Sequence, residues 1–235
     1  MKLKNFLLAL CILLLVPAVA GAENKYYLGE KLKGYKQAEF VLLTGDDVNF
    51  RKAPVNGQVI KCLPHHTLMR VIERNGDWLK VDISGTEGYV AANFAGQGSR
   101  DQLISDDFTG VMADLGTKFD EARAKTELGK PQREYRDKET KRDMYDYGRV
   151  VLGVRHNKVA SIEIKDSQFI TMRGVSIGDS NGRAIGQYGM PDGVVYAKDC
   201  TEYEYRLNGE AQCRFVIGVD SNNAIKKFVM ELLDD

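Results

Sequence analysis

Short apolar runs separated by turn-forming residues predict β-strands as the dominant element of this chain. Between residues 38 and 96 the runs are bounded by Thr44-Gly45-Asp46-Asp47 and by Asn75-Gly76, and both compositions are typical of tight turns. The segment Trp78–Ile83 alternates apolar and polar residues, as a half-buried strand does. Strands this short, with turns at such close spacing, predict a small β-barrel or sandwich over residues 38–96.

The remainder of the chain, residues 106–235, contains an internal repeat. Gly129-Lys130-Pro131 ends one amphipathic run and Gly189-Met190-Pro191 ends another, which predicts a short helix before each mark. Alternating strands follow both marks, and residues 149–154 recur as residues 214–219. A single helix on a small sheet buries little area, so we expect the two units to share one core. The predicted units are 106–166 and 167–235.

The first 22 residues have the order of a secretory signal peptide. Lys2 and Lys4 give a positive start, residues 7–16 form an apolar core, and Ala20-Gly21-Ala22 supplies small residues for cleavage. An uncleaved anchor is disfavoured because a spanning helix needs about 20 apolar residues. Cys11 lies inside the apolar core, which disfavours lipoprotein attachment. We predict an exported protein, periplasmic or secreted, with no stable membrane span after cleavage.

Residues 38–96 resemble the bacterial SH3-like (SH3b) domain family. The resemblance rests on blocks in matching order: Val48-Asn49-Phe50-Arg51 followed by Pro54, Val59-Ile60, residues 76–81, and Glu87-Gly88-Tyr89-Val90. The chain departs from the family at Phe50, where a small aliphatic residue is commoner, and at Tyr89, where Trp is frequent. The resemblance implies a small β-barrel that serves cell-wall proteins as a binding module for peptidoglycan stem or bridge peptides.

Asn49, Arg51, Trp78 and Tyr89 are the candidate ligand-binding residues of this module. Side chains fill the interior of a small barrel, so its ligands bind in grooves between loops. Trp78 follows a hairpin turn and Tyr89 precedes a strand end, where aromatic rings offer a flat platform for a peptide or a sugar. Asn49 and Arg51 adjoin the first long loop and offer polar contacts. Each residue alone is better explained by packing or by holding a loop, but together they predict a groove.

The duplicated part resembles a widespread exported α+β repeat, the fold shared by small outer-membrane assembly lipoproteins and tandem β-lactamase inhibitory proteins. The shared motifs are the helix starts, the Gly-x-Pro stops, a tyrosine strand and a Lys-Val-x-x-Ile strand, and they mark the fold without carrying chemistry. Tyr145, Tyr147, Tyr203 and Tyr205 either form an aromatic contact face or cover the sheet, and their alternation favours the second reading. The predicted fold class is therefore multi-domain and mainly β with α+β: a small SH3-like β-barrel followed by a duplicated helix-plus-antiparallel-sheet domain.

Charge and cysteine content reduce the range of possible functions and bear on whether the protein contains a disulfide. The chain has 33 basic and 33 acidic residues, and loss of Lys2 and Lys4 leaves 31 basic ones, a balance that argues against nucleic-acid binding. Cys62, Cys200 and Cys213 remain after cleavage, in an oxidising compartment. Cys200 and Cys213 are near enough in sequence to pair across a hairpin, or all three cysteines stay reduced. Cys62 suits a buried apolar position in a strand.

No active site or cofactor site stands out from the residue pattern. His65, His66 and His156 fall at predicted turns, where we expect exposed side chains, and no Cys or Ser lies in a nucleophile elbow. The spacings Cys-x-x-Cys and His-x-x-x-His are absent, so a zinc site is not expected. Paired carboxylates of a glycosidase stay open, although no acid has an apolar setting. We expect no catalytic residue, no metal and no cofactor.

These patterns favour an exported, non-enzymatic binding protein. The first hypothesis is recognition of peptidoglycan or another envelope component through the SH3-like module, with the duplicated domain as a scaffold or protein-binding surface. The second is that the duplicated domain inhibits or regulates an extracellular or periplasmic enzyme. The third is an envelope hydrolase with an unrecognised carboxylate site.

Overall fold

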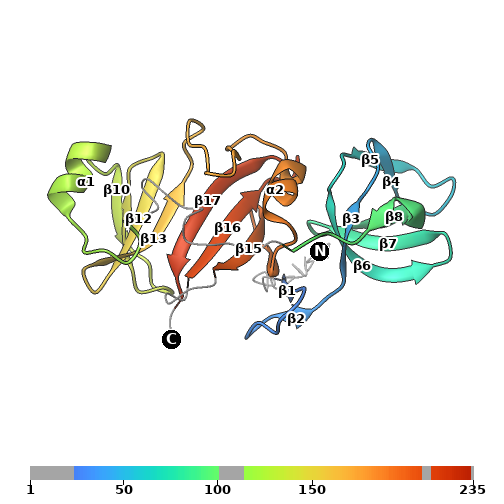
Figure 1. Ribbon diagram of the computed structural model, residues 1–235, viewed down its shortest axis with the longest axis horizontal. Helices are drawn as coiled ribbons and strands as arrows, with labels where there is room; N and C mark the ends of the chain where they lie inside the picture. The colour runs from blue at the N-terminus through green and yellow to red at the C-terminus, as the bar shows by residue number, and fades with distance from the viewer. Residues whose placement is uncertain (1–23, 101–113, 208–212, 234–235) are drawn as a thin grey trace, which may run out of the picture.

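The computed structural model describes residues 24–100, 114–207 and 213–233, which form two β-sheets and two short α-helices (Figure 1). The predicted leader, residues 1–22, lies outside the described residues, as do residues 101–113 and 208–212. Within this described part, no helix combines the length and the apolar run that a membrane span requires. The chain is therefore mainly β, as its hydrophobic pattern predicts.

The smaller sheet has seven strands and encloses its own apolar core. Its order is β5-β4-β8-β7-β6-β3-β9, and the strands are β3 (Phe40–Leu43), β4 (Val48–Arg51), β5 (Val59–Leu63), β6 (Leu68–Asn75), β7 (Trp78–Ile83), β8 (Thr86–Ala91) and β9 (Ala95–Gly96). The predicted turn at Gly76 is confirmed, but one residue later than expected: Asn75 pairs with Trp78, so Gly76-Asp77 joins β6 to β7. Ser84-Gly85 joins β7 to β8. Gly76 has a φ of 56°, which glycine adopts without strain.

The predicted closed barrel is not detected. Irregularities at Phe50/Arg51 and between Val71 and Glu73 curl the sheet around its core. However, β5 and β9 stay at its two edges, and no pairing among the described residues joins them. The reason is that β9 is only two residues long and pairs with β3 alone. The sheet wraps its core without a continuous ladder around it.

The larger sheet has ten strands in the order β10-β11-β12-β13-β17-β16-β15-β14-β1-β2. Its strands are β1 (Asn24–Tyr27), β2 (Lys36–Gln37), β10 (Arg133–Arg136), β11 (Asp143–Asp146), β12 (Val150–Arg155), β13 (Lys158–Ile164), β14 (Gly193–Tyr196), β15 (Thr201–Leu207), β16 (Cys213–Val219) and β17 (Ile225–Leu232). The helices are α1 (Glu121–Leu128) and α2 (Asn181–Tyr188). Each helix precedes a four-stranded antiparallel run, and the two runs meet where β13 pairs with β17.

Matching details in the two halves agree with the internal repeat. The pairing shifts at Gly153/Val154 in one half and at Gly218/Val219 in the other, and these positions correspond in the repeated sequence. Both helices begin with a side chain that accepts a hydrogen bond from the backbone N–H three residues later: Asp120 caps α1, and Ser180 caps α2. Both end at the glycine of a Gly-x-Pro mark, in a positive-φ conformation.

The N-terminal segment belongs to the larger sheet. Its polar composition predicts a loop over residues 23–37, but β1 pairs antiparallel with β14, and β2 pairs parallel with β1. The physical reason is the burial of Tyr26, which is only 8% exposed and packs edge-on against Phe40 and Tyr196. The segment thus fills the space between the two sheets.

The two sheets share apolar and polar contacts around that segment. Phe40, Leu42 and Leu68 of the smaller sheet belong to the same buried cluster as the helices and strands of the larger one. The hydroxyl of Thr201 donates to Ser84 Oγ at 2.7 Å, which ties the β7–β8 turn to the start of β15. Figure 1 shows the smaller sheet beside the end of the larger one that carries β1. This packing fixes the orientation of the smaller sheet.

The cysteines do not pair as one of the two hypotheses expected. In the β15–β16 hairpin Leu207 is opposite Cys213, whereas Cys200 precedes the far end of β15. That separation is roughly 20 Å along the strand, beyond the reach of a disulfide. All three cysteines are free, and Cys62 is exposed on β5, not buried in a strand as predicted. Its side chain lies on the outer side of this edge strand, and the sequence pattern alone does not predict which face of the strand it projects from.

Candidate functional site

Three of the four predicted binding residues line one hollow on the smaller sheet. Asn49 and Arg51 come from β4, and Trp78 is the first residue of β7, directly after the Gly76 turn. The hollow has a volume of about 240 Å³ and is open to solvent. Trp78 is half-buried, so its ring is held by the sheet and still reaches the hollow.

Tyr89, the fourth predicted residue, does not line the hollow but lies next to it. In the strand register Tyr89 is opposite Arg51 of β4 on one side and Lys80 of β7 on the other. Residues opposite each other in a sheet project from the same face. Tyr89 therefore extends the outer face that carries the hollow, and Gly88 beside it turns inward against the buried ring of Phe50.

The sequence did not single out three further lining residues: Asp46, Asp47 and Phe94. Asp46 and Asp47 are exposed in the β3–β4 turn, and their composition had suggested only a turn. Phe94 is 38% exposed and lies in the 3-10 turn η1 (Ala92–Phe94). A Cβ at position 45 would lie 2.7 Å from its ring, so Gly45 lets Phe94 approach the turn. Nothing local in the sequence indicates that approach.

The polar side chains of the hollow have different tasks. The Arg51 Nη1 donates to the carbonyl of Gly57 at 3.0 Å and so holds the β4–β5 loop. Asn49 Oδ1 accepts a weak bond from Cys62 Sγ at 3.6 Å. The carboxylates of Asp46 and Asp47 face solvent at the same rim. The hollow thus combines two aromatic rings with a rim that is more acidic than basic.

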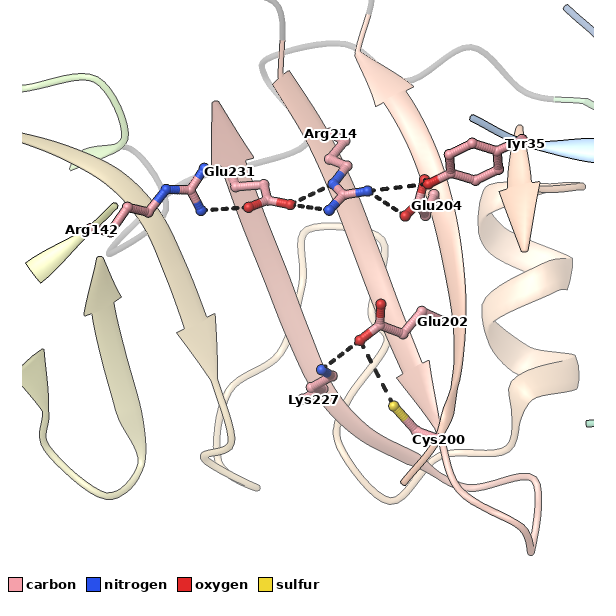
Figure 2. Close-up of polar contacts among 8 residues, drawn as sticks. All are labelled: Tyr35, Arg142, Cys200, Glu202, Glu204, Arg214, Lys227 and Glu231. Carbon is pink, nitrogen blue, oxygen red and sulfur yellow. Dashed lines mark hydrogen bonds and ion pairs between the residues drawn. The ribbon is translucent and has the colours of Figure 1, made fainter. Parts of the chain in front are cut away.

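A second polar arrangement crosses the larger sheet as a chain of alternating charges (Figure 2). Arg142 Nη1 donates to Glu231 Oε2 at 2.5 Å, and Arg214 bonds both Glu231 and Glu204. The hydroxyl of Tyr35 donates to Glu204 Oε2 at 2.6 Å and ends the chain. We call these five residues the ion ladder. It joins the first half, the second half and the N-terminal segment.

Burial and charge oppose each other along the ion ladder. Burial alone would raise the pKa of Glu231, but Arg214 and Arg142 outweigh it and hold this pKa below its usual value. Burial likewise disfavours the charge of Arg214, yet Glu204 and Glu231 raise its pKa. Burial and then the Glu204 carboxylate raise the pKa of Tyr35, which keeps its proton. For Glu231 and Arg214 the pKa shifts therefore favour the charged forms that this ion pair requires.

A shorter contact lies beside the ion ladder. Lys227 Nζ donates to Glu202 Oε1 at 2.7 Å, and the thiol of Cys200 lies 3.9 Å from the same oxygen (Figure 2). Burial raises the pKa of Cys200. A thiol with a raised pKa is protonated at neutral pH and is a poor nucleophile. This cluster therefore has the character of a structural contact.

The tyrosines of the repeat cover the sheet and do not form a contact face. Tyr147, Tyr203 and Tyr205 are buried in the core, and Tyr145 packs on Phe119. Tyr203 accepts a hydrogen bond from Asn181 Nδ2 at 2.9 Å, and burial raises its pKa to about 12.

The histidine turn after Pro64 is packed against α2, where the sequence predicted exposed side chains. His65 and His66 are half-buried, and their rings stack with centroids 3.9 Å apart. A Cβ at position 182 would lie 2.6 Å from the carbonyl oxygen of His65, so the turn needs Gly182 in order to dock on α2. Within the described residues no group of His, Cys, Asp or Glu side chains is arranged to hold a metal ion.

Comparisons with known proteins do not assign the chain to a family. No protein-family model matches it, and no curated protein matches it. Solved structures with distant similarity include a Bacillus anthracis extracellular protein containing a SCP domain (11% identity, TM-score 0.36, 57% of this chain and 49% of that one). A second is a Staphylococcus aureus cysteine-rich secretory protein (11% identity, TM-score 0.39, 58% of this chain and 52% of that one). A third is a Bacillus subtilis DUF4309 family protein (13% identity, TM-score 0.37, 54% of this chain and 88% of that one).

The present chain spans about half the length of the first two structures. The first is an extracellular protein and the second a secretory protein, and these descriptions apply to those proteins alone. With TM-scores this low, the similarities support neither a shared fold nor a shared function.

Proposed function

We propose that this chain is an exported, non-enzymatic binding protein that recognises peptidoglycan or another envelope component through the hollow beside Trp78. The observation that carries the proposal is the convergence of Trp78, Asn49 and Arg51 with Phe94 around one open hollow. The protein acts in the periplasm or outside the cell, in keeping with the predicted leader. The resemblance of residues 38–96 to SH3-like modules favours the same kind of ligand.

The chemistry of the hollow favours a peptide that carries a positive charge. Aromatic rings bind flat peptide groups and aliphatic stems with little loss of side-chain entropy. Asp46 and Asp47 stand at the same rim, and Arg51 is already bonded to the Gly57 carbonyl. A free amino group on the ligand would meet the two carboxylates and the face of Trp78 together. Peptidoglycan stem peptides with a diamino acid have this chemistry.

The hollow is also presented in a fixed direction. The shared core and the Thr201–Ser84 hydrogen bond hold the smaller sheet against the larger one. A ligand therefore meets a site that is already formed, and less ordering entropy is lost on binding. The duplicated part serves this proposal as a rigid scaffold.

Tryptophan fluorescence tests the proposal directly, because Trp78 is the single tryptophan of the chain. We expect soluble muropeptides to shift or quench its emission in a saturable way. Trp78→Ala and Phe94→Ala should each reduce retention on insoluble peptidoglycan at least about tenfold, as expected for aromatic anchors. The double variant Asp46→Asn/Asp47→Asn should lose more affinity for muropeptides that contain a free amine than for muropeptides whose amine is acetylated.

Ile72→Ala is the matched control, since Ile72 is 37% exposed on the same sheet and does not line the hollow. It should bind as the unchanged protein does. No retention of the unchanged protein at moderate salt would reject the envelope ligand. Equal losses for Ile72→Ala and Trp78→Ala would reject the hollow as the site.

A second candidate function is inhibition or regulation of an envelope enzyme through the larger sheet. The observation that favours it is an exposed apolar pair, Ile170 and Met172, each 63% exposed in the loop that joins the two halves. Stoichiometric inhibition of a purified secreted hydrolase, lost in Ile170→Ser with Met172→Ser, would support this candidate. Unchanged inhibition in that variant would remove it.

A further inference from the structure

The two halves of the larger sheet treat their outer strands differently. In the second half β14 is almost fully buried, because β1 pairs along its outer edge. The corresponding strand of the first half, β10, is exposed at every position and pairs only with β11. Figure 1 shows β10 at the end of the sheet that points away from the smaller sheet. One edge is covered by a strand of the chain itself, and its counterpart is open.

An open strand edge is a template for a further strand, and its side chains decide which strand fits. Residues 133–137 read Arg-Glu-Tyr-Arg-Asp. The antiparallel ladder continues to Asp137, whose N–H donates to the Arg142 carbonyl, so five residues are extended along this edge. Tyr135 is 38% exposed in their middle, and the guanidinium of Arg133 lies over its ring.

This sequence is complementary to itself in one antiparallel register. With Tyr135 opposite Tyr135 of a second copy, Glu134 faces Arg136 and Arg133 faces Asp137, each pair occurring twice. A register centred between Glu134 and Tyr135 puts Arg133 against Arg136, and one centred on Glu134 puts that carboxylate against itself. Like charges directly opposite each other destabilise a strand pair. Only the Tyr135-centred register combines opposite charges with a central aromatic pair.

We propose that the β10 edge is a self-association surface, where two copies of this chain pair antiparallel about Tyr135 and join their larger sheets. We choose a second copy as the occupant because the charges of β10 are complementary to those of another β10 strand in antiparallel orientation. Glu134 makes no ion pair in the described part of the chain, while Arg136 holds Asp143 at 2.8 Å on an exposed surface and can contact Glu134 of the other copy as well. The inference does not depend on what the Trp78 hollow binds.

Sedimentation analysis of the protein without its predicted leader tests the surface, under reducing conditions that exclude a Cys62 disulfide. An edge this short gives a small interface, so we expect a weak, reversible dimer. The fraction of dimer should increase as the protein concentration is raised to about 0.5 mM. Glu134→Arg alone and Arg136→Glu alone should each weaken association at least about tenfold, because attractive cross-strand pairs become repulsive. A mixture of these two variants should associate again, since every facing pair is then opposite in charge.

The mixture also shows that both variants are folded, because an unfolded chain would not form the mixed dimer. The double variant Glu134→Arg/Arg136→Glu should self-associate within about threefold of the unchanged protein. Lys61→Glu on β5, another exposed edge strand, is the control and should change nothing. A strictly monomeric protein at the highest concentration overturns the proposal. So does a dimer that Lys61→Glu abolishes and the β10 variants leave intact.

Discussion

Replacing Glu231 by Gln removes the central charge of the ion ladder while keeping its shape. Glu231 is 12% exposed and lies between Arg142, 7% exposed, and Arg214, 25% exposed. The substitution leaves two guanidinium groups facing each other across a neutral amide. Gln retains one acceptor oxygen, so one of the two hydrogen-bond partners can still be satisfied. Arg142 also keeps its bond to the Leu232 carbonyl at 3.2 Å.

The expected cost follows from this burial. Removing one partner of a buried ion pair costs about 3–5 kcal/mol, and the retained acceptor places this case near 3 kcal/mol. For a chain of this size, such a loss corresponds to a decrease of about 6–12 °C in Tm. Urea unfolding followed by circular dichroism should show a lower midpoint with an unchanged slope, which identifies a change in stability and not in compactness.

Glu39→Gln supplies the comparison for an exposed pair. Glu39 and Arg74 are bonded, but their side chains are 46% and 55% exposed. Water and salt screen such a pair, so we expect no measurable change in the free energy of unfolding. Equal stabilities of Glu231→Gln and Glu39→Gln would refute the reasoning, because the ion ladder would then contribute no more than a surface contact does.

We expect three further outcomes. Because the pKa of Glu231 is lowered by folding, its stabilisation should be complete above pH 4.5 and fade as the pH falls through the lower folded value; an acid titration of Glu231→Gln should lack this component. Phe40→Ala, at a site only 5% exposed, should cost about 3–4 kcal/mol and split one calorimetric transition into two, whereas a single unshifted transition would contradict the shared core. Because Cys200 and Cys213 are free, adding reductant should change the Tm of the double variant Cys200→Ser/Cys213→Ser no differently from the Tm of the unchanged protein. A disulfide-linked peptide that contains both cysteines in an unreduced digest would contradict this.

The parts of the fold that the sequence predicts are those governed by local chemistry. The Gly-x-Pro marks end both helices because a positive-φ residue and a following proline stop a helix wherever they occur. Gly76 begins the β6–β7 hairpin turn for a similarly local reason, because glycine adopts a positive φ without strain. The repeated strands are recognisable because their alternation survives in both halves. Each of these signals lies within a few residues of the element that it specifies.

The sequence does not predict the N-terminal strand β1, because its pairing partner β14 is far away along the chain. Residues 24–27 look polar, and only Tyr26 hints at a buried face. Their pairing with β14 depends on an edge that exists only after the second half has folded. Strand pairing of this kind depends on the partner's register and burial, and a local window contains neither.

The candidate sites likewise divide into residues that the sequence can group and residues that only the folded chain brings together. Trp78, Asn49 and Arg51 could be grouped because the resemblance to SH3-like modules supplied their neighbourhood. Phe94 could not, since a lone aromatic after two alanines and an asparagine has no pattern of its own. The ion ladder escaped notice because its charges are scattered over four segments. The one available signal was Glu204, which interrupts a tyrosine strand and is only 1% exposed at its side chain.

The unequal halves suggest how the duplicated part divides its work. At matching positions α2 buries Ile185 and Tyr188, whereas α1 carries an exposed Lys125 and a half-buried Leu128. A lysine cannot take the place of Ile185 in a core without losing its hydration, so α1 packs more loosely than α2. The tightly packed half is the one that holds β1 and the smaller sheet. The more buried half therefore carries the smaller sheet with the Trp78 hollow, whereas the half with the exposed α1 ends at the open β10 edge, where we propose that a second copy pairs.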